Sequence, residues 1–239
     1  MTGYTAVITG GNKGIGADLA AAMTARGWRV VSLARHPGDA PEVQHVTCDL
    51  SDPQAVASAA GDIAAQHEVT HFIHNAGIIL PNLIEDAQPA DMLALTQLHL
   101  ASALTLTQAF LPAMKKRRFG RILFNASRAA LGAKTRTAYS ASKAGMIGMA
   151  RTWALELAEH GITVNVVAPG PILTDNFWGI VPKDSPQEAS LASRIPVGRL
   201  GTVADVTRAF MFLAEPEAGF ITGQTLFVCG GASIGTVPI

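Results

Sequence analysis

The sequence has 239 residues, 49% of them hydrophobic and 15% charged, and its 18 basic residues balance its 18 acidic ones. This length and composition predict a single compact domain over residues 1–239, with no room for a second one. Because the formal net charge is zero, no face is expected to neutralise nucleic-acid phosphates or a membrane surface, and we expect neither partner. The first apolar run is too brief for a signal peptide and no uncharged run reaches membrane-spanning length, which favours a cytoplasmic protein.

Short β-rich apolar runs alternate along the chain with longer helix-compatible stretches, starting with a strand at residues 5–9. Between Arg35 and Val43 the segment is rich in Pro and Gly, so a loop replaces the helix expected there. The remaining strands are predicted at residues 28–33, 43–48, 69–74, 121–125, 162–167 and 225–228, and helices at 14–26, 53–66, 90–116, 138–160 and 203–214. This order predicts a single-domain, Rossmann-like α/β fold, with a doubly wound seven-stranded parallel sheet and helices on both faces.

The segment 176–200 interrupts the periodicity near the end of the chain. It mixes the apolar residues Phe177, Trp178, Ile180 and Val181 with three prolines. In a sheet of this kind such an insertion is expected to act as a substrate lid over an apolar pocket.

A glycine-rich segment from Thr9 to Gly16 lies between the first predicted strand and the first predicted helix. Glycine permits a tight turn and lets backbone N–H groups approach a pyrophosphate at a helix N-terminus, although purely structural turns also use glycine. The residues expected to bind a dinucleotide here are Gly10, Asn12, Lys13, Gly14, Ile15 and Gly16.

The end of the second strand indicates which dinucleotide binds. An acidic residue there would accept hydrogen bonds from the ribose hydroxyls of NAD, but this sequence has Ala34 and Arg35. Arg35 and Lys13 can converge on one 2′-phosphate, which predicts NADP(H) as the cofactor. The alternative is that both are solvated surface charges.

A tyrosine and a lysine, Tyr139 and Lys143, are four residues apart at the start of a predicted helix and therefore share one helical face. A phenol is a poor acid or base at neutral pH, and the positive charges of Lys143 and of an oxidised nicotinamide would lower its pKa. Ser127 follows the predicted strand 121–125, at the edge where open α/β sheets bind ligands, and can hydrogen-bond a substrate oxygen. The alternative for Ser127 is an ordinary turn residue.

Taken together, these segments resemble the short-chain dehydrogenase/reductase family over essentially the whole chain. The later segments that carry the resemblance are Asp49-Leu50, Asn75-Ala76-Gly77, Asn165 to Gly170 with Thr174, and Ile221 to Gln224. The resemblance implies that Asp49 contacts the adenine, that Asn75 and Gly77 line the cofactor ribose and that Lys143 binds the nicotinamide ribose. The further cofactor-binding residues that it implies are Leu50, Ala76, Tyr139, Pro169, Gly170, Ile172 and Thr174. It also implies a homotetramer formed through helices 90–116 and 138–160, and the Lys13 and Arg35 pair resembles the NADPH-preferring carbonyl reductases.

This sequence departs from the family pattern at three positions. His99 stands where the family usually has a catalytic asparagine, and it is either a water-binding group in the proton relay or a core histidine. The separation from Ser127 to Tyr139 is one residue shorter than usual, which places a deletion in the loop 131–137. Cys229 replaces an aspartate, and with Cys48 it has no metal or redox spacing, so both are expected in the core.

The sequence therefore predicts an oxidoreductase that transfers a hydride between NADP(H) and a small-molecule carbonyl or alcohol, with Tyr139 as general acid and base. No metal is expected, because the tyrosine, serine and lysine supply the electrostatic stabilisation. One alternative is a 3-oxoacyl carrier-protein reductase, for which Arg128, Lys134 and Arg136 are candidate docking cations. A more remote one is a non-catalytic NADP-sensing protein that kept the fold.

Overall fold

Seven parallel strands form one sheet in the computed structural model, which describes residues 3–179 and 181–234. The strand order is β3-β2-β1-β4-β5-β6-β7, so the connections change direction between β1 and β4. The strands are Thr5–Thr9 (β1), Arg29–Ala34 (β2), Gln44–Thr47 (β3), His71–His74 (β4), Gly120–Asn125 (β5), Ile162–Pro169 (β6) and Thr225–Val228 (β7). This confirms the predicted doubly wound α/β fold, in which a ligand crevice is expected where the strand order reverses.

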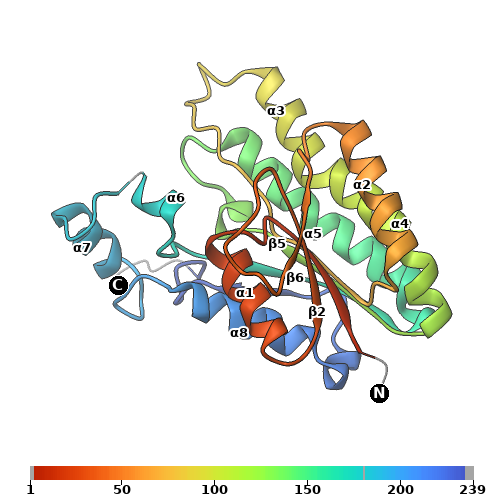
Figure 1. Cartoon of the computed structure of the whole chain (residues 1–239). Coiled ribbons are helices and arrows are strands. Elements are labelled where there is room, and N and C mark those ends of the chain that lie inside the picture. The colour runs from red at the N-terminus through yellow and green to blue at the C-terminus, as the bar shows by residue number, and fades with distance from the viewer. Residues whose placement is uncertain (1–2, 180, 235–239) are drawn as a thin grey trace.

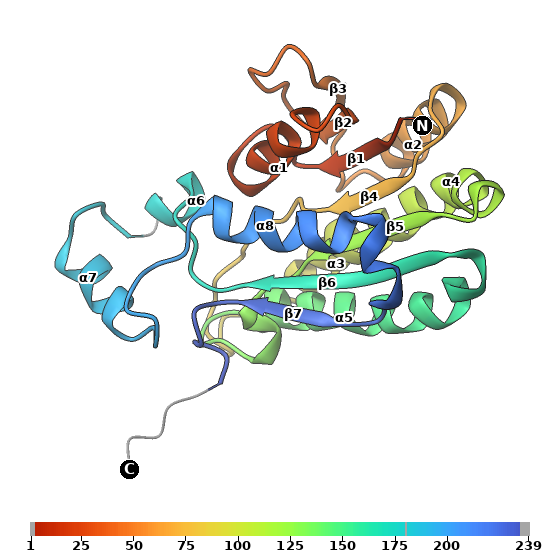
Figure 2. The same ribbon diagram turned by 90° about the horizontal axis from the view of Figure 1, so that it is seen from below.

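Helices cover both faces of the sheet (Figures 1 and 2). One face carries α2 (Pro53–Gln66), α4 (Ser102–Arg117) and α5 (Thr137–Leu157), and the other carries α1 (Gly14–Thr24) and α8 (Val203–Ala214). The shorter helices are α3 (Pro89–Thr96), α6 (Asp175–Trp178) and α7 (Pro186–Ser193). None of the helices in the described ranges has the length and apolarity needed to cross a membrane.

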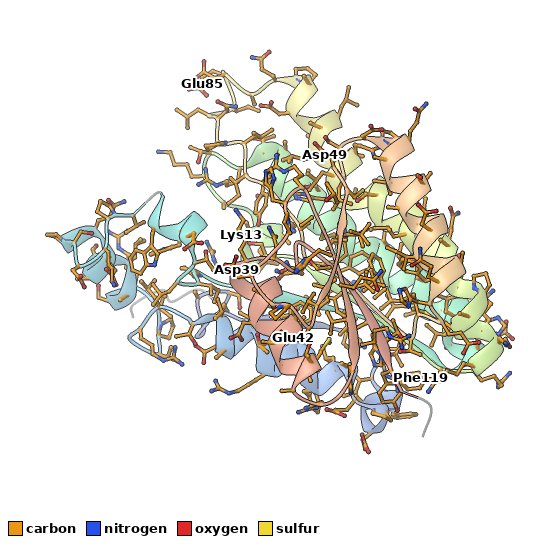
Figure 3. The ribbon with its side chains drawn as sticks, viewed as in Figure 1. Lys13, Asp39, Glu42, Asp49, Glu85 and Phe119 are labelled. Carbon is orange, nitrogen blue, oxygen red and sulfur yellow. The ribbon has the colours of Figure 1, made fainter. Side chains whose placement is uncertain are left out.

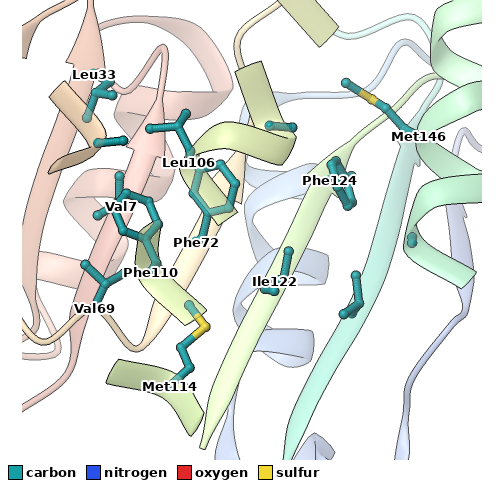
Figure 4. Packing of buried hydrophobic residues seen from close by; sticks show 14 of the residues in the cluster. Val7, Leu33, Val69, Phe72, Leu106, Phe110, Met114, Ile122, Phe124 and Met146 are labelled. Carbon is teal, nitrogen blue, oxygen red and sulfur yellow. The ribbon is translucent and has the colours of Figure 1, made fainter. Parts of the chain in front are cut away.

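Two hydrophobic cores hold these layers together. In the core under α2, α4 and α5, Phe72, Phe110 and Phe124 are fully buried and pack beside Ile122 and Met146 (Figure 4). The other core joins the sheet to α1 and α8. Cys48 and Cys229 are both buried free thiols, as predicted, and Cys48 belongs to the core under α2, α4 and α5. Burial of each large side chain contributes about 1.5–3 kcal/mol to the free energy of folding. The two cores therefore hold the strands firmly in place, and with them the edge of the sheet on which the loops converge.

The helix predicted over residues 90–116 is divided in two. Between α3 and α4 the π-helix η1 (Gln97–Ala101) widens the backbone by one residue per turn, and His99 lies at its centre. A sequence period of 3.6 residues does not reveal such an insertion, so the helix was predicted as continuous.

The loop prediction between β2 and β3 is confirmed, since the chain forms no helix between residues 35 and 43. The segment 176–200 contains α7 and most of α6, and Figure 2 shows both beyond the end of β6. The prediction at Ile180 lies outside the described residues.

Candidate active site

The glycine turn after β1 has the backbone geometry that its sequence predicted. Gly10 and Gly14 have φ angles of +65° and +54°, in the left-handed region that favours glycine. A Cβ on Gly16 would lie 2.0 Å from the Gly10 carbonyl oxygen, so α1 approaches the turn more closely than any other residue type allows. No side chain of the described residues caps α1 at Lys13, whereas Asp52 caps α2 and Thr202 caps α8. The first N–H groups of α1 are therefore available to an anion.

Asn75, after β4, ties this turn to the neighbouring strands. Its Nδ2 donates to the carbonyl oxygens of Thr9 (3.1 Å) and Gly10 (3.2 Å), and its Oδ1 accepts from Asn125 Nδ2 at 2.8 Å. Thr9 Oγ1 accepts from the backbone N–H groups of Asn75 (2.9 Å) and Ala76 (3.0 Å). The side-chain amide of Asn75 is thus occupied by hydrogen bonds that hold the turn in place. A ribose would have to contact other atoms near Asn75.

Lys13 and Arg35 are both exposed and lie on adjoining loops. Asn12 Nδ2 donates to the carbonyl oxygen of His36 at 3.2 Å, which joins the glycine turn to the end of β2. Hydrogen bonds from Ser51 lower the pKa of Asp49, with a smaller contribution from the Arg35 guanidinium. Figure 3 shows Lys13 and Asp49 toward the end of the molecule opposite Phe119, which precedes β5, so these charges belong to the carboxyl edge of the sheet.

The loop after β6 reaches the same turn. A Cβ on Gly14 would lie 3.6 Å from the Thr174 methyl carbon, and Thr174 Oγ1 accepts from the Phe177 N–H at the start of α6. Gly170 is packed so closely that a Cβ there would lie 2.9 Å from Cys229 Cα. Two of the expected cofactor residues, Leu50 and Ile172, have side chains buried in the cores.

Tyr139, Lys143 and Ser127 come together beside this edge. Tyr139 and Lys143 lie on one face of α5, with Lys143 Nζ 5.6 Å from the centre of the Tyr139 ring. Lys143 is 2% exposed, and its Nζ donates to the Asn125 carbonyl oxygen at 2.7 Å. Ser127, before the short 3-10 helix η2 (Arg128–Leu131), makes a side-chain hydrogen bond to Tyr139. The shorter loop before α5 therefore still brings the two hydroxyl groups together.

Burial controls the protonation of this group. It lowers the pKa of Lys143 from 10.5 to about 7. It also raises the pKa of Tyr139, although the Ser127 hydrogen bond and the charge of Arg136 act in the opposite direction. The protein side chains alone thus do not lower the phenol pKa, because burial outweighs the nearby cation. The sequence predicts a lowered phenol pKa, whereas in the protein without cofactor the pKa of Tyr139 is raised.

His99 packs against this group from η1. Its ring is completely buried, with its centroid 5.8 Å from that of Tyr139 in an edge-to-face arrangement. Its Nδ1 lies 2.8 Å from Ser142 Oγ, while its Nε2 has no hydrogen-bond partner among the described residues. The residue is therefore buried, as a core histidine would be, but one of its two ring nitrogens is not satisfied.

Sequence reasoning did not assign three residues that contact this group. Arg136, which the sequence offers as a candidate docking cation, acts electrostatically on Tyr139. Asn125 contributes a backbone carbonyl and Ser142 a hydroxyl, through contacts that no motif reports. The position of Arg136 three residues before Tyr139 was the one available signal.

Several known proteins are similar to this chain in sequence or in fold. The sequence model of a family described as "Enoyl-(Acyl carrier protein) reductase" matches residues 10–233. The chain is 35% identical to the 3-oxoacyl-[acyl-carrier-protein] reductase FabG of Salmonella typhimurium, over 96% of this chain and 97% of the relative. It is 34% identical to the (2S)-[(R)-hydroxy(phenyl)methyl]succinyl-CoA dehydrogenase subunit BbsD of Thauera aromatica, over 96% of each.

Solved structures are also similar to this chain over nearly its whole length. A putative NAD(P)-dependent gluconate 5-dehydrogenase from Beutenbergia cavernae, with bound NADP, superposes with a TM-score of 0.91 at 32% identity, over 98% of each chain. The structure titled "ElxO with NADP Bound" superposes with a TM-score of 0.90 at 27% identity, over 98% of this chain and all of that one.

A doubly wound sheet with a glycine turn and a tyrosine, lysine and serine at its carboxyl edge defines the class of this protein as a nucleotide-dependent oxidoreductase. More particularly, the chain belongs to the short-chain dehydrogenase/reductase family.

Proposed function

We propose that this protein reduces a ketone or aldehyde with NADPH, and oxidises the corresponding alcohol in reverse. The observation that carries the proposal is the buried Lys143 beside Tyr139, with the Ser127 hydroxyl bonded to the phenol. A proton donor, a hydrogen-bond donor for the same oxygen and a cation are the groups that carbonyl reduction requires.

The residues at the carboxyl edge fit a dinucleotide phosphate. The space beside Gly16 is so narrow that any Cβ would fill it. The uncapped start of α1 provides N–H groups for a pyrophosphate. Lys13 and Arg35 are exposed cations on adjoining loops, which suits a 2′-phosphate, and two structural neighbours were solved with bound NADP. When bound, the nicotinamide supplies or accepts the hydride.

In the proposed reduction, Tyr139 gives its phenolic proton to the substrate oxygen while Ser127 donates a hydrogen bond to the same atom. The resulting phenolate is stabilised by positive charge, which Lys143, Arg136 and an oxidised nicotinamide carry. With a pKa of about 7, Lys143 is half protonated at neutral pH. It can therefore return a proton to Tyr139 without a large energetic cost.

Replacing Tyr139 by Phe tests the assignment. We expect NADPH oxidation with a panel of ketones and aldehydes to fall by at least about 100-fold, because the proton donor is lost. NADPH affinity, measured by fluorescence titration, should change by no more than several-fold. Tyr139 is one of only two tyrosines, and Tyr4→Phe, near Trp28 and Phe119, is the matched control that keeps its activity. Full activity in Tyr139→Phe would refute the assignment, as would a wild-type protein that reduces no carbonyl and acts only as an NADP sensor.

A second candidate, 3-oxoacyl carrier-protein reduction, is favoured by the 35% identity to FabG over nearly the whole chain. The candidate docking cations differ in exposure, since Lys134 is exposed while Arg128 and Arg136 are half-buried. If the protein has this activity, the rate of reduction should be much higher with an acetoacetyl carrier protein than with a small acetoacetyl thioester. Lys134→Glu should reduce only the carrier-protein rate, and equal loss on both substrates would count against docking.

We also propose that residues 176–200 form a substrate lid and that α4 and α5 assemble a homotetramer. Phe177 and Trp178 pack edge-to-face at 5.2 Å and are half-buried, which supports an apolar inner surface, while Val181 is buried in the protein. On α5, Leu155 is 86% exposed, as expected of a residue that another subunit covers.

A further inference from the structure

Two contacts of the Ser142 hydroxyl favour one tautomer of the buried His99 ring. Ser142 Oγ donates its single hydrogen to the Tyr139 carbonyl oxygen at 2.9 Å. Both contacts of Ser142 Oγ are hydrogen bonds at the same time only when His99 Nδ1 carries a proton and donates it over the 2.8 Å, because the serine has a single hydrogen. In a neutral ring this leaves Nε2 unprotonated, as a hydrogen-bond acceptor.

The unprotonated nitrogen faces Lys143. A Cβ built on Gly77 would lie 2.9 Å from His99 Nε2 and 3.4 Å from Lys143 Nζ, so both nitrogens border the same space above Gly77. Gly77 has no positive φ, so its small size serves this close approach and not a special backbone conformation. A residue with a side chain at position 77 would displace the ring or the ammonium group.

The neighbours of His99 keep its ring neutral. Burial lowers its pKa to about 2, with a smaller contribution from the charge of Lys143 on α5, and His74 on β4 is a further titratable neighbour. His74 is itself fully buried with a pKa of about 3, and Tyr139 is the remaining titratable group against the ring. A ring that stays uncharged can accept a hydrogen bond from an ammonium group but does not compete with it for positive charge.

We propose that His99 is a positioning residue, which Ser142 fixes as the Nδ1–H tautomer so that Nε2 accepts a hydrogen bond that reaches it from the Lys143 ammonium group through one water molecule. This role deepens the proposed function, on which it rests. The hydrogen bond favours the charged form of Lys143, and through that charge the phenolate of Tyr139. In this way a neutral histidine raises the pKa of a lysine that burial lowers.

Histidine NMR tests the tautomer without substrate. In protein labelled with 15N at histidine, we expect His99 to show the Nδ1–H form, unchanged from pH 6 to 9. Replacing Ser142 by Ala should allow the Nε2–H form to appear. The matched control is Ser102→Ala, because Ser102 is also buried and its Oγ also donates to a helix carbonyl, that of Leu98. An Nε2–H or charged His99 in the wild type would overturn the proposal.

Titration of Lys143, followed by its 13Cε shift, tests the link between the two residues. His99→Phe keeps a ring but removes Nε2, and it should lower the pKa of Lys143 by about one unit, the size expected for one lost hydrogen bond to a charged group. Ser142→Ala should move it in the same direction, and Ser102→Ala should not. In alcohol oxidation the phenolate of Tyr139 is the base, and it is less stabilised when Lys143 is less charged. The apparent pKa of the acid limb of the kcat–pH profile should therefore rise by about one unit in His99→Phe, with KM unchanged.

An unchanged Lys143 pKa in both His99→Phe and Ser142→Ala would overturn the proposal. The NMR measurements need no reaction, so a failure of the proposed function is recognised separately. A protein with the expected tautomer and lysine shift that reduces no carbonyl contradicts the proposed function alone.

Discussion

Replacing the buried Lys143 by Met should change how the stability of the protein depends on pH. The folded state lowers the pKa of Lys143 from 10.5 to about 7 because the side chain is only 2% exposed. Between these two values the unfolded chain binds more protons than the folded one, so the free energy of unfolding rises with pH. Below pH 7 the charged lysine costs its full amount, and above 10.5 the cost is gone. The shift corresponds to about 5 kcal/mol in all, or about 1.4 kcal/mol per pH unit.

The assay is urea denaturation of the wild type and Lys143→Met at several pH values between 6.5 and 9.5. We expect the variant to be the more stable protein at pH 6.5, since methionine has no charge to bury. Its advantage should then decrease by about 3 kcal/mol over the range, while the m-values stay equal. The variant should also lose its reductase activity, because Tyr139 loses its neighbouring cation.

Lys116→Met provides the control, since the Lys116 side chain is 79% exposed and pairs with Glu68 at 3.2 Å on the surface. Its stability difference from the wild type should not vary with pH in this range. Parallel pH profiles for the wild type and Lys143→Met would refute the argument, because they would mean that burial does not lower the pKa of Lys143.

Three further predictions concern the cofactor turn, the choice of dinucleotide and the assembly. Gly16→Ala should lower both Tm and NADPH affinity, because its Cβ would meet the Gly10 oxygen at 2.0 Å, whereas Gly61→Ala in the open interior of α2 should stabilise the protein by about 0.5–1 kcal/mol. Arg35→Asp should shift the kcat/KM preference from NADPH toward NADH, and an unchanged preference would contradict the role of Arg35. Light scattering should give four times the 24.9 kDa mass of the chain, and Leu155→Glu should reduce it; a monomeric wild type would exclude the tetramer.

The sequence predicted the architecture of this protein because the features that specify it are local. Runs of buried strand residues such as Ile162–Pro169 are mostly apolar, and the glycine turn lies directly between a strand and a helix in the sequence. The same local logic brought Tyr139 and Lys143 together, since residues four apart on a helix share a face. The replacement of a helix by a loop after β2 was equally readable, from prolines and glycines.

Other properties depended on contacts between residues far apart in the chain. The π-helix at His99 and the burial of Leu50 and Ile172 were not predicted, because periodicity does not report where a side chain packs. The pKa of Tyr139 was expected to be lowered, and the protein alone raises it, because desolvation is a property of the folded surroundings.

By itself, the sequence determined the fold, the family and the residues that meet at the carboxyl edge, because those follow from short-range patterns. Only the tertiary structure decided how these groups are protonated and what supports them. Burial lowers the pKa of Lys143, and the His99 ring contacts the hydroxyl of Ser142, which is 43 residues away in the chain. Hydrogen bonds and desolvation depend on which residues are close in space, and a sequence pattern does not report the spatial distance between residues that are far apart in the chain.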